Sequence, residues 1–477
     1  MRFPGFIGAA YTTRSLSVDC QRCVGLFPEI NEAKTASNGE IGSLMSTPGL
    51  RRLATVGTGP IRGLLRVAIS GNLAVVSGNK LYSVDSSWVA TEKGTLQTST
   101  GPVDMTSNLY QLGIVDGALG YVYDSTQKIP FFVVPGFPAA DRIDFLDSYV
   151  LFNIKGTGSF GFSALNDISS VDPLDYQTVE GSPDNLVGLV VSNRQVWCPG
   201  TDSMEVFINV GDPVNPFQRI PGAFIEFGCD SSFSIQKIGN SIIWVGGGAN
   251  GAGTVWRAEG YQPTRISTHA IELALQSSGD LSNARAWTYQ QDGHQFYAIT
   301  VPGQNTSWFY DLATGLWHER INFKAGAELR YRGDCHAFVY DTHVVGDYED
   351  GRIYALDFDK FTDDGDVIIR ERTSPHLGDD GKRIFWDYMQ IEARVGVGLD
   401  GTTQGVDPQI MMQWSNDAGY TWTPERWTTL GKIGQYLARA IWRRMGFSRY
   451  RVVRVRYSEP TQLVLLGASI NLRPGVN

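Results

Sequence analysis

Cysteine, methionine and charge are all scarce in this chain of 477 residues, which has 5 Cys, 8 Met and 19% charged residues. Domains stabilised by disulfides carry many cysteines in even number, so an odd few in a long chain indicate reduced thiols. No stretch approaches the roughly 18 to 20 apolar residues of a membrane helix. Pro4, Gly5 and Gly8 interrupt the region where a signal peptide would have its apolar core. We therefore expect no membrane segment and no targeting segment.

Local groupings of catalytic or metal-binding residues are also missing. The histidines show no H-x-x-x-H pair, and there is no G-x-S-x-G motif. Cys20 and Cys23 form a C-x-x-C pair, but the next cysteine is Cys198 and the first histidine is His269, so a zinc set is not completed. The sequence therefore predicts a protein that is not an enzyme and has no catalytic residues, no cofactor and no metal.

Glycine and aromatic residues are abundant instead. The chain has 54 Gly and 21 Pro, 12% aromatic residues and 42% hydrophobic residues. This hydrophobic content suffices for a large core, and the glycines follow no collagen period. Because Gly disfavours long helices and favours turns, the composition predicts an all-β protein.

A strand–turn–strand pattern recurs along the first three quarters of the chain. Its copies begin at Gly71, Gly113, Asp144, Gly188, Ile238, Trp287 and Phe338, which are 42, 31, 44, 50, 49 and 51 residues apart. Each copy is typical of a β-hairpin, and a four-stranded propeller blade occupies about 40 to 50 residues. The spacing predicts a degenerate six- or seven-bladed β-propeller over residues 56–360. Stacked sandwiches are the alternative fold.

The remaining residues form the ends of the predicted architecture. Residues 1–55 are expected to be an N-terminal arm with the strands that enter the fold. Polar, acidic turns follow Asp357, after which strands resume, and this predicts a β-sandwich-like domain over residues 361–477. Residues 415–422 match the hairpin motif S-x-D-x-G-x-T-W, whereas residues 431–446 are compatible with either a short helix or a strand.

Charge is distributed unevenly. The formal net charge is −9, which disfavours a nucleic-acid coat protein. Residues 1–360 carry 25 Lys and Arg against 36 Asp and Glu, while residues 361–477 carry 15 against 13. The segment 426–456 holds nine basic residues, eight of them Arg, and no acidic one. Two interpretations follow: a surface for nucleic acid or an acidic partner, or an arginine ladder that pairs with the protein's own acidic groups within or between subunits.

Two segments resemble a known family. The first is Cys20–Glu29 with Ser46–Leu50, and the second is Arg439–Arg449, which contains W-R-R-M-G-F-S-R, with Val452–Pro460. Together and in this order they resemble the packaged-DNA stabilisation proteins of short-tailed phages of the P22 type. Departures from the family pattern are small, such as Gly25 in place of Asn.

The resemblance implies a structural tail hub, or nozzle. Such a protein forms a hexameric ring below the portal and adaptor rings, extends the DNA exit channel, retains the packaged genome and forms part of the ejection conduit. The implied partners are further copies of the chain, the portal–adaptor rings, tailspike and tail needle, and double-stranded DNA in transient, non-specific contact. The implied location is the virion tail, assembled in the host cytoplasm.

A site follows from combining the charge pattern with the resemblance. We expect the acidic part to face the channel, because like charge suppresses binding of DNA. We expect the assembly interface to use Arg439, Arg443, Arg444, Arg449, Arg454 and Arg456. The alternatives are a carbohydrate-binding or glycan-degrading β-propeller, whose paired carboxylates would be non-local in sequence, and a receptor-binding tail protein.

Overall fold

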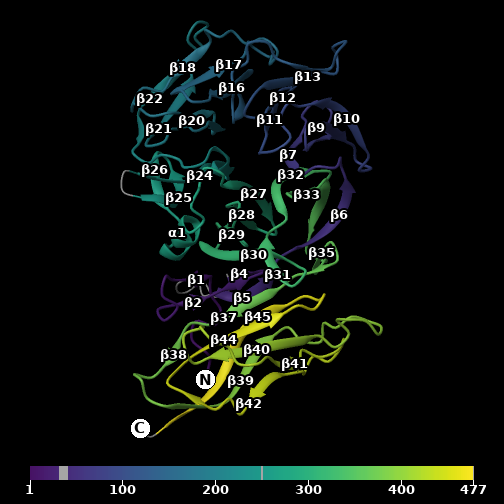
Figure 1. Cartoon of the computed structure of the whole chain (residues 1–477), viewed down its shortest axis with the longest axis vertical. Coiled ribbons are helices and arrows are strands. Elements are labelled where there is room, and N and C mark those ends of the chain that lie inside the picture. Colours follow the sequence, from purple (N-terminus) through teal and green to yellow (C-terminus); the bar gives the residue numbers. More distant parts are fainter. Residues whose placement is uncertain (32–40, 249–250, 476–477) are drawn as a thin grey trace.

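The computed structural model describes residues 1–31, 41–248 and 251–475. Strands dominate, and within these residues the one α-helix is α1 (His269–Gln276). Figure 1 shows an elongated molecule with a large β domain at one end and a smaller one at the other. No helix in the described ranges has the length and apolar character to cross a membrane.

Seven four-stranded antiparallel units make up the larger domain. Blade 1 contains β7 (Ile61–Arg66), β8 (Leu73–Ser77), β9 (Lys80–Val84) and β10 (Ala90–Thr95). Blade 2 contains β11 (Asp104–Ser107), β12 (Leu112–Val115), β13 (Gly120–Tyr123) and β14 (Phe131–Val133). Blade 3 contains β15 (Ile143–Leu146), β16 (Tyr149–Ile154), β17 (Ser159–Phe162) and β18 (Tyr176–Thr178). Blade 4 contains β19 (Val190–Ser192), β20 (Gln195–Pro199), β21 (Met204–Asn209) and β22 (Phe217–Ile225). Blade 5 contains β23 (Gln236–Ile238), β24 (Ser241–Gly248), β25 (Gly251–Glu259) and β26 (Gln262–Arg265). Blade 6 contains β27 (Arg285–Gln291), β28 (His294–Thr300), β29 (Ser307–Asp311) and β30 (Leu316–Lys324). Blade 7 contains β32 (Gly333–Val339), β33 (Thr342–Asp347), β34 (Arg352–Asp357) and β6 (Gly49–Thr55).

The first strands of successive blades lie next to one another around a ring, from β7 through β32 and back to β7. This arrangement is a seven-bladed β-propeller, and it confirms the predicted fold class within the described residues. Each predicted hairpin falls in a different blade, because the alternation of apolar residues and turn residues that marks a hairpin recurs once per blade. The glycine-rich turn between β24 and β25 includes residues 249–250, which lie outside the described residues.

The ring is closed by a strand from the other end of the chain. β6 is the outer strand of blade 7 and pairs antiparallel with β34, so that Leu50 lies opposite Leu356. Leu50 is buried in a cluster with Tyr354 and Leu356. β6 belongs to the segment that the sequence placed in the N-terminal arm; the structure uses it to hold the first and last blades together.

The smaller domain is a β-sandwich of two sheets. One contains β37 (Arg370–Thr373), β44 (Tyr450–Tyr457), β40 (Gln409–Ser415) and β41 (Arg426–Thr429), with β38 (Leu377–Gly378) also pairing with β44. The other contains β4 (Leu26–Ile30), β5 (Ile41–Ser46), β45 (Val464–Pro474), β39 (Ile384–Ala393) and β42 (Ala440–Arg443), with β43 (Phe447–Ser448) beside β39. The predicted sandwich is confirmed, and the segment whose structure the sequence left undecided forms turns followed by β42.

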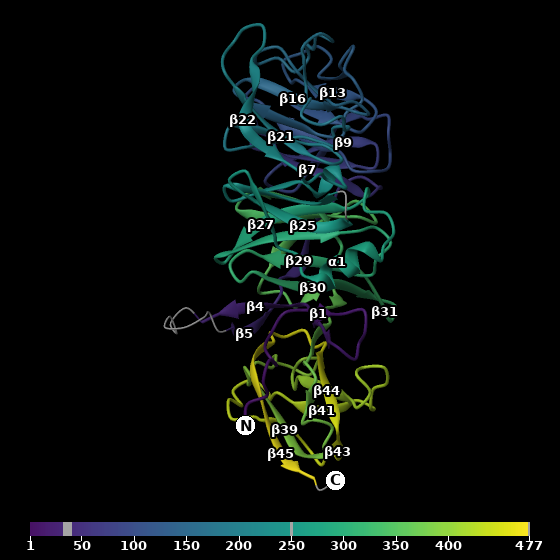
Figure 2. The same ribbon diagram turned by 90° about the vertical axis from the view of Figure 1, so that its left-hand side faces the viewer.

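A two-residue strand connects the two domains. β3 (Cys23–Val24) pairs in parallel with β30 of blade 6 and antiparallel with β37 of the sandwich, so one continuous sheet crosses the boundary. Figure 2 shows β4 and β5 at the same level, between the propeller and the sandwich. The predicted S-x-D-x-G-x-T-W turn forms beside β40, where Asp417 accepts hydrogen bonds from Thr421.

The closing strand can be tested by truncating one buried side chain. We expect Leu50→Ala to lower the free energy of unfolding by about 2–5 kcal/mol, because it leaves a cavity between β6 and β34. Arg51→Ala on the same strand is the matched control, and its exposed pair with Asp357 should contribute less than about 1 kcal/mol. Denaturant titration measures both values. Equal effects would show that β6 adds nothing to the core.

Candidate assembly surface on the C-terminal domain

The six arginines expected at an assembly interface fall into two groups. Arg454 and Arg456 lie on β44 and are partly buried. The other four, Arg439, Arg443, Arg444 and Arg449, are exposed on β42 and the turns around it. The structure therefore does not bring all six together on one surface.

Arg456 is part of an ion-pair network between the domains. Its guanidinium contacts Glu371 of β37 and, at 3.1 Å, Glu328 of β31 (Ala327–Arg330), a strand that pairs with β30. Arg22 contacts Glu319 at 2.8 Å, Glu328 at 3.3 Å and Glu371 at 3.9 Å. Two arginines thus face three carboxylates where the sandwich meets blade 6. For Arg456, this is the second interpretation of the basic segment, pairing within the chain.

Burial gives this network its energetic weight. Glu371 is 1% exposed, and burial alone would raise its pKa. Arg22 and Arg456 more than offset that effect, so that the pKa of Glu371 lies below its ordinary value. Arg454 lies beside the network, where it donates to Gln413 at 2.6 Å and stacks on Trp422 at 4.1 Å.

A further arginine, Arg451, was not among the expected site residues. It is 1% exposed and lies over Trp386 at 4.9 Å and over Trp414 at 5.2 Å. It donates to the carbonyl of Met445 at 2.9 Å, and burial lowers its pKa to about 10. Alternation along β44 was the available signal, because it places Arg451 on the same face as buried Val453 and Val455 and opposite to Arg454 and Arg456. Arg451 holds the sandwich core together and is not available to a partner.

The four exposed arginines are held mainly through backbone contacts. Arg449 donates to the carbonyl of Gly381 at 2.6 Å, and Arg443 lies 6.0 Å from the ring centroid of Tyr388. Arg444 adopts a φ of 57°, and its backbone N–H donates to the carbonyl of Asp387 at 3.0 Å. Among the described residues none of the four forms an ion pair with a carboxylate. Their charge is therefore available to another molecule.

Exposed apolar side chains accompany these charges. The loop of residues 431–439, here called the basic loop, exposes Ile433 at 55%, Tyr436 at 72% and Leu437 at 93%. Lys432 and Arg439 are exposed at its two ends. Sequence reasoning missed these apolar residues, because the pattern of the segment did not decide between helix and strand. A surface with an apolar centre and arginines at its edge is typical of protein interfaces.

The basic loop is well ordered by internal contacts. The N–H of Gly434 donates to the carbonyl of Gly396 at 3.2 Å, and the N–H of Lys432 donates to Oε1 of Gln435 at 3.0 Å. A Cβ on Gly396 would lie 2.8 Å from the ring of Tyr436, which shows how closely that ring packs on the backbone. A partner would therefore meet a preformed surface and would not have to order it.

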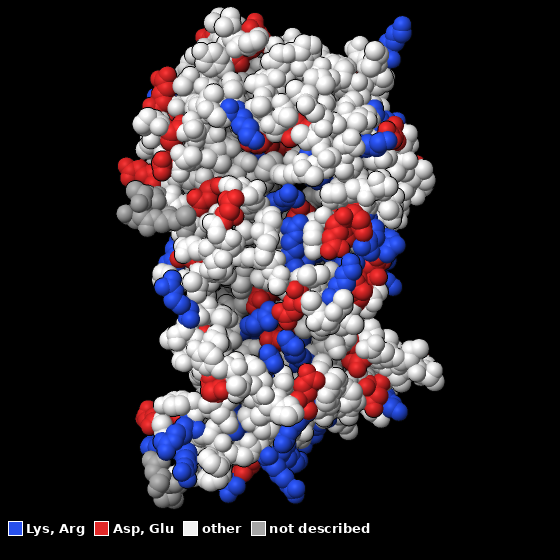
Figure 3. All heavy atoms as spheres, in the orientation of Figure 1, with Lys and Arg blue, Asp and Glu red and all other residues white. Residues whose placement is uncertain are grey.

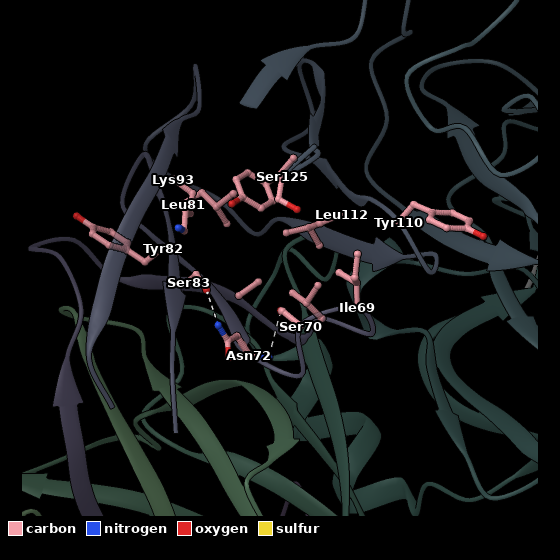
Figure 4. Close-up of a pocket in the computed structure, with 13 residues that line it drawn as sticks. Ile69, Ser70, Asn72, Leu81, Tyr82, Ser83, Lys93, Tyr110, Leu112 and Ser125 are labelled. Carbon is pink, nitrogen blue, oxygen red and sulfur yellow. Dashed lines mark hydrogen bonds between the residues drawn. The ribbon is translucent and has the colours of Figure 1, made fainter. Parts of the chain in front are cut away.

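The propeller also has a hollow with an apolar floor. A hollow between blades 1 and 2 is floored by Leu81 and Leu112 and rimmed by Lys93, Ser70 and Asn72 (Figure 4), and no Asp or Glu lines it.

Near the propeller axis the cavities are lined by paired charges. Asp104, Asp144 and Asp334 face Arg142, Lys237 and Arg285. The described residues hold no cluster of His, Cys, Asp or Glu suited to a metal ion.

These features define a two-domain, all-β protein: a seven-bladed propeller joined through a shared sheet to a sandwich that carries a basic, apolar-centred surface. A family model for the bacteriophage P22 Gp10 β-propeller matches residues 23–361, and a model for the Gp10 β-sandwich matches residues 369–473. The chain belongs to the bacteriophage P22 Gp10 family and is a phage structural protein. This finding confirms the resemblance drawn from the two short segments.

Comparison with solved structures finds matches at low sequence identity. The extracellular domain of the putative one component system BT4673 from B. thetaiotaomicron matches with a TM-score of 0.44 and 11% identity over 65% of this chain and 40% of that chain. The Neurospora crassa Pan2 WD40 domain matches with a TM-score of 0.40 and 9% identity over 62% and 89%.

Catalytically inactive virginiamycin B lyase from Staphylococcus aureus matches with a TM-score of 0.44 and 13% identity over 64% of this chain and 98% of that chain. Comparison with curated protein sequences finds no match.

The interdomain network predicts unequal effects of two arginine substitutions. We expect Arg456→Ala to lower the free energy of unfolding by about 2 kcal/mol, less than the 3–5 kcal/mol of an isolated buried pair because Arg22 still faces Glu371. Arg443→Ala, on the exposed group, should change it by less than about 0.5 kcal/mol. Thermal or denaturant unfolding measures both. A larger loss of stability for Arg443→Ala than for Arg456→Ala would contradict the assignment of Arg456 to the interdomain network and of Arg443 to the exposed group.

The same network predicts a loss of stability in acid. Because the folded pKa of Glu371 lies below its ordinary value of about 4.3, its contribution is present above that pH and is lost as the pH falls through the folded pKa. Glu371→Gln should therefore be less stable than the wild type at pH 7, and the difference should shrink below about pH 4. Unfolding midpoints measured between pH 3 and 7 test this. If the difference in stability between Glu371→Gln and the wild type did not change with pH, a lowered pKa of Glu371 in the folded state would be excluded.

Proposed function

We propose that the chain is the tail hub, or nozzle, of a short-tailed phage. The observation that carries the proposal is the match of both domains, in order, to the P22 Gp10 family. In this role several copies, six by the family resemblance, form a ring below the portal and adaptor rings. The ring extends the DNA channel, retains the packaged genome and forms part of the ejection conduit.

The build of the molecule supports a mechanical role. The shared sheet through β3, the network around Glu371 and the continuous core between blades 5–6 and the sandwich join the domains into one body. Such a body transmits force without bending at a linker, which suits a protein that resists the pressure of packaged DNA.

Charge supports the proposed relation to DNA and to partners. The acidic excess lies in residues 1–360, and like charge weakens non-specific binding of DNA to a wall along which it slides. The exposed arginines, Arg439, Arg443, Arg444 and Arg449, would bind neighbouring subunits or the portal–adaptor rings, with tailspike and tail needle attached around the hub. The proposed location is the virion tail, after assembly in the host cytoplasm, and the proposed role requires no catalysis.

Reversing two exposed charges tests the assembly role. We expect Arg443→Glu with Arg444→Glu to reduce the number of complete tails about tenfold or more, while the far-UV circular dichroism spectrum stays that of the wild type. Arg66→Glu with Lys128→Glu is the control, because it reverses two exposed charges on the propeller that, like Arg443 and Arg444, form no ion pair within the described residues. Negative-stain imaging and plaque counts provide the readout.

Two outcomes would count against this role of the arginines. Normal tails from which DNA leaks would assign Arg443 and Arg444 to DNA contact. Normal tails with normal DNA retention would exclude both residues from function.

A further inference from the structure

The chain carries a second unpaired surface, of opposite sign to the basic loop. Residues 156–193 contain five acidic residues and no Lys or Arg. These acidic residues are Asp167, Asp172, Asp175, Glu180 and Asp184. None of them forms an ion pair with a basic side chain within the described ranges. The segment mirrors residues 426–456, which contain nine basic residues and no acidic one.

The centre of this surface is an acidic turn, residues 172–176. The N–H of Asp175 donates to the carbonyl of Asp172 at 2.9 Å, and this bond fixes the turn. Leu174 is 81% exposed and Tyr176 is 50% exposed. Partial burial and the nearby charge of Asp172 raise the pKa of Asp175. The turn thus combines exposed apolar side chains with carboxylates that repel each other and lack a cation.

A neighbouring loop extends the acidic surface. The N–H of Phe162 donates to the carbonyl of Asp175 at 3.2 Å, and the ring of Phe162 lies 5.3 Å from that of Phe217. Phe217 begins β22 directly after the loop of residues 210–216, in which Val214 is 85% exposed and Asp212 is exposed. The acidic turn of blade 3 and this loop of blade 4 are thus connected through a buried aromatic contact, and each exposes an apolar side chain and an acidic one.

The two surfaces cannot meet within one chain. β18 and β22 lie at the far end of the propeller, whereas β41 and β42, which flank the basic loop, belong to the sandwich (Figures 1 and 2). The basic loop itself packs on Gly396, beyond the end of β39 that pairs with β45 next to β5, so the propeller separates it from the acidic turn. On the face shown in Figure 3, acidic side chains are seen along the upper left edge, in the region of β18 and β22.

We infer that the basic loop of one copy docks on the acidic turn of the next copy. Leu437 and Tyr436 would pack against Leu174 and Tyr176, with Arg439 against Asp175. A second copy fits better than DNA, because Ile433 and Leu437 gain nothing on a phosphate backbone but are well placed against an apolar protein surface.

The contact is heterologous, since the two copies contribute different surfaces. Successive copies joined by this contact form a closed ring when the rotation that relates one copy to the next is a whole fraction of 360°. The inference rests on the proposed hub, whose subunit contact it specifies.

Cross-linking in phage particles tests the contact. In a chain with Leu174→Cys and Leu437→Cys, mild oxidation should give a ladder of covalent multimers, because each copy would be linked to the next. Each single variant should stay monomeric, since the native cysteines other than Cys335 are buried. Val89→Cys with Leu437→Cys is the control, because Val89 is 59% exposed but lies in blade 1, outside the acidic surface of blades 3 and 4.

The outcomes separate this inference from the proposed hub. Particles that contain the double variant but yield only monomers overturn the contact and leave the hub standing. Complete tails that contain no copy of the chain overturn the hub.

A charge exchange gives an independent readout. Arg439→Glu or Asp175→Lys alone should lower incorporation into tails about tenfold, or ~1.4 kcal/mol, and the two together should restore it. Full incorporation of either single variant, or no restoration in a folded double variant, counts against the contact.

Discussion

The rest of the structure depends on the insertion of β3 between the propeller and the sandwich. This strand completes a sheet that runs from blade 6 into the C-terminal domain, and it brings Arg22 against Glu319 and Glu371. Because the carboxylate of Glu371 is removed from water, it is stable only with cations on both sides, from Arg22 and Arg456. The geometry between the domains is therefore fixed by charge as well as by packing.

The N-terminal residues join parts of the fold that are remote in sequence. Buried Arg372 donates to the carbonyls of Phe6 and Ala9 and so holds the arm against the sandwich. Further along the chain, β4 and β5 extend one sandwich sheet and β6 closes the propeller. The N-terminal segment thus links the two domains, because β4 and β5 belong to the sandwich and β6 belongs to the propeller.

The hairpins, which repeat locally, could be predicted from the sequence, whereas the pairings between residues far apart in the chain could not. Seven hairpin signals located seven blades, since the turn and the alternating apolar residues lie within a few residues of each other. The pairing of Leu50 with Leu356 and of Val24 with Glu319 joins segments about 300 residues apart, for which no local pattern exists. Likewise, the charge pattern singled out Arg456 but could not show that Glu328 and Glu371 face it.

The net charge of −9 is a sum over the whole chain, and it hides two surfaces of opposite sign, the basic loop and the acidic turn, that do not neutralise each other within one molecule. The rigid connection between the domains keeps the two surfaces apart. A flexible linker would let the basic loop fold back on the acidic turn, whereas the shared sheet holds the loop on the sandwich and the turn at the far end of the propeller. Charges that cannot be neutralised within the chain are available to other copies or partners, and screening by salt weakens that attraction. The same interdomain contacts that stabilise the monomer therefore also leave the basic loop and the acidic turn free to associate with other molecules.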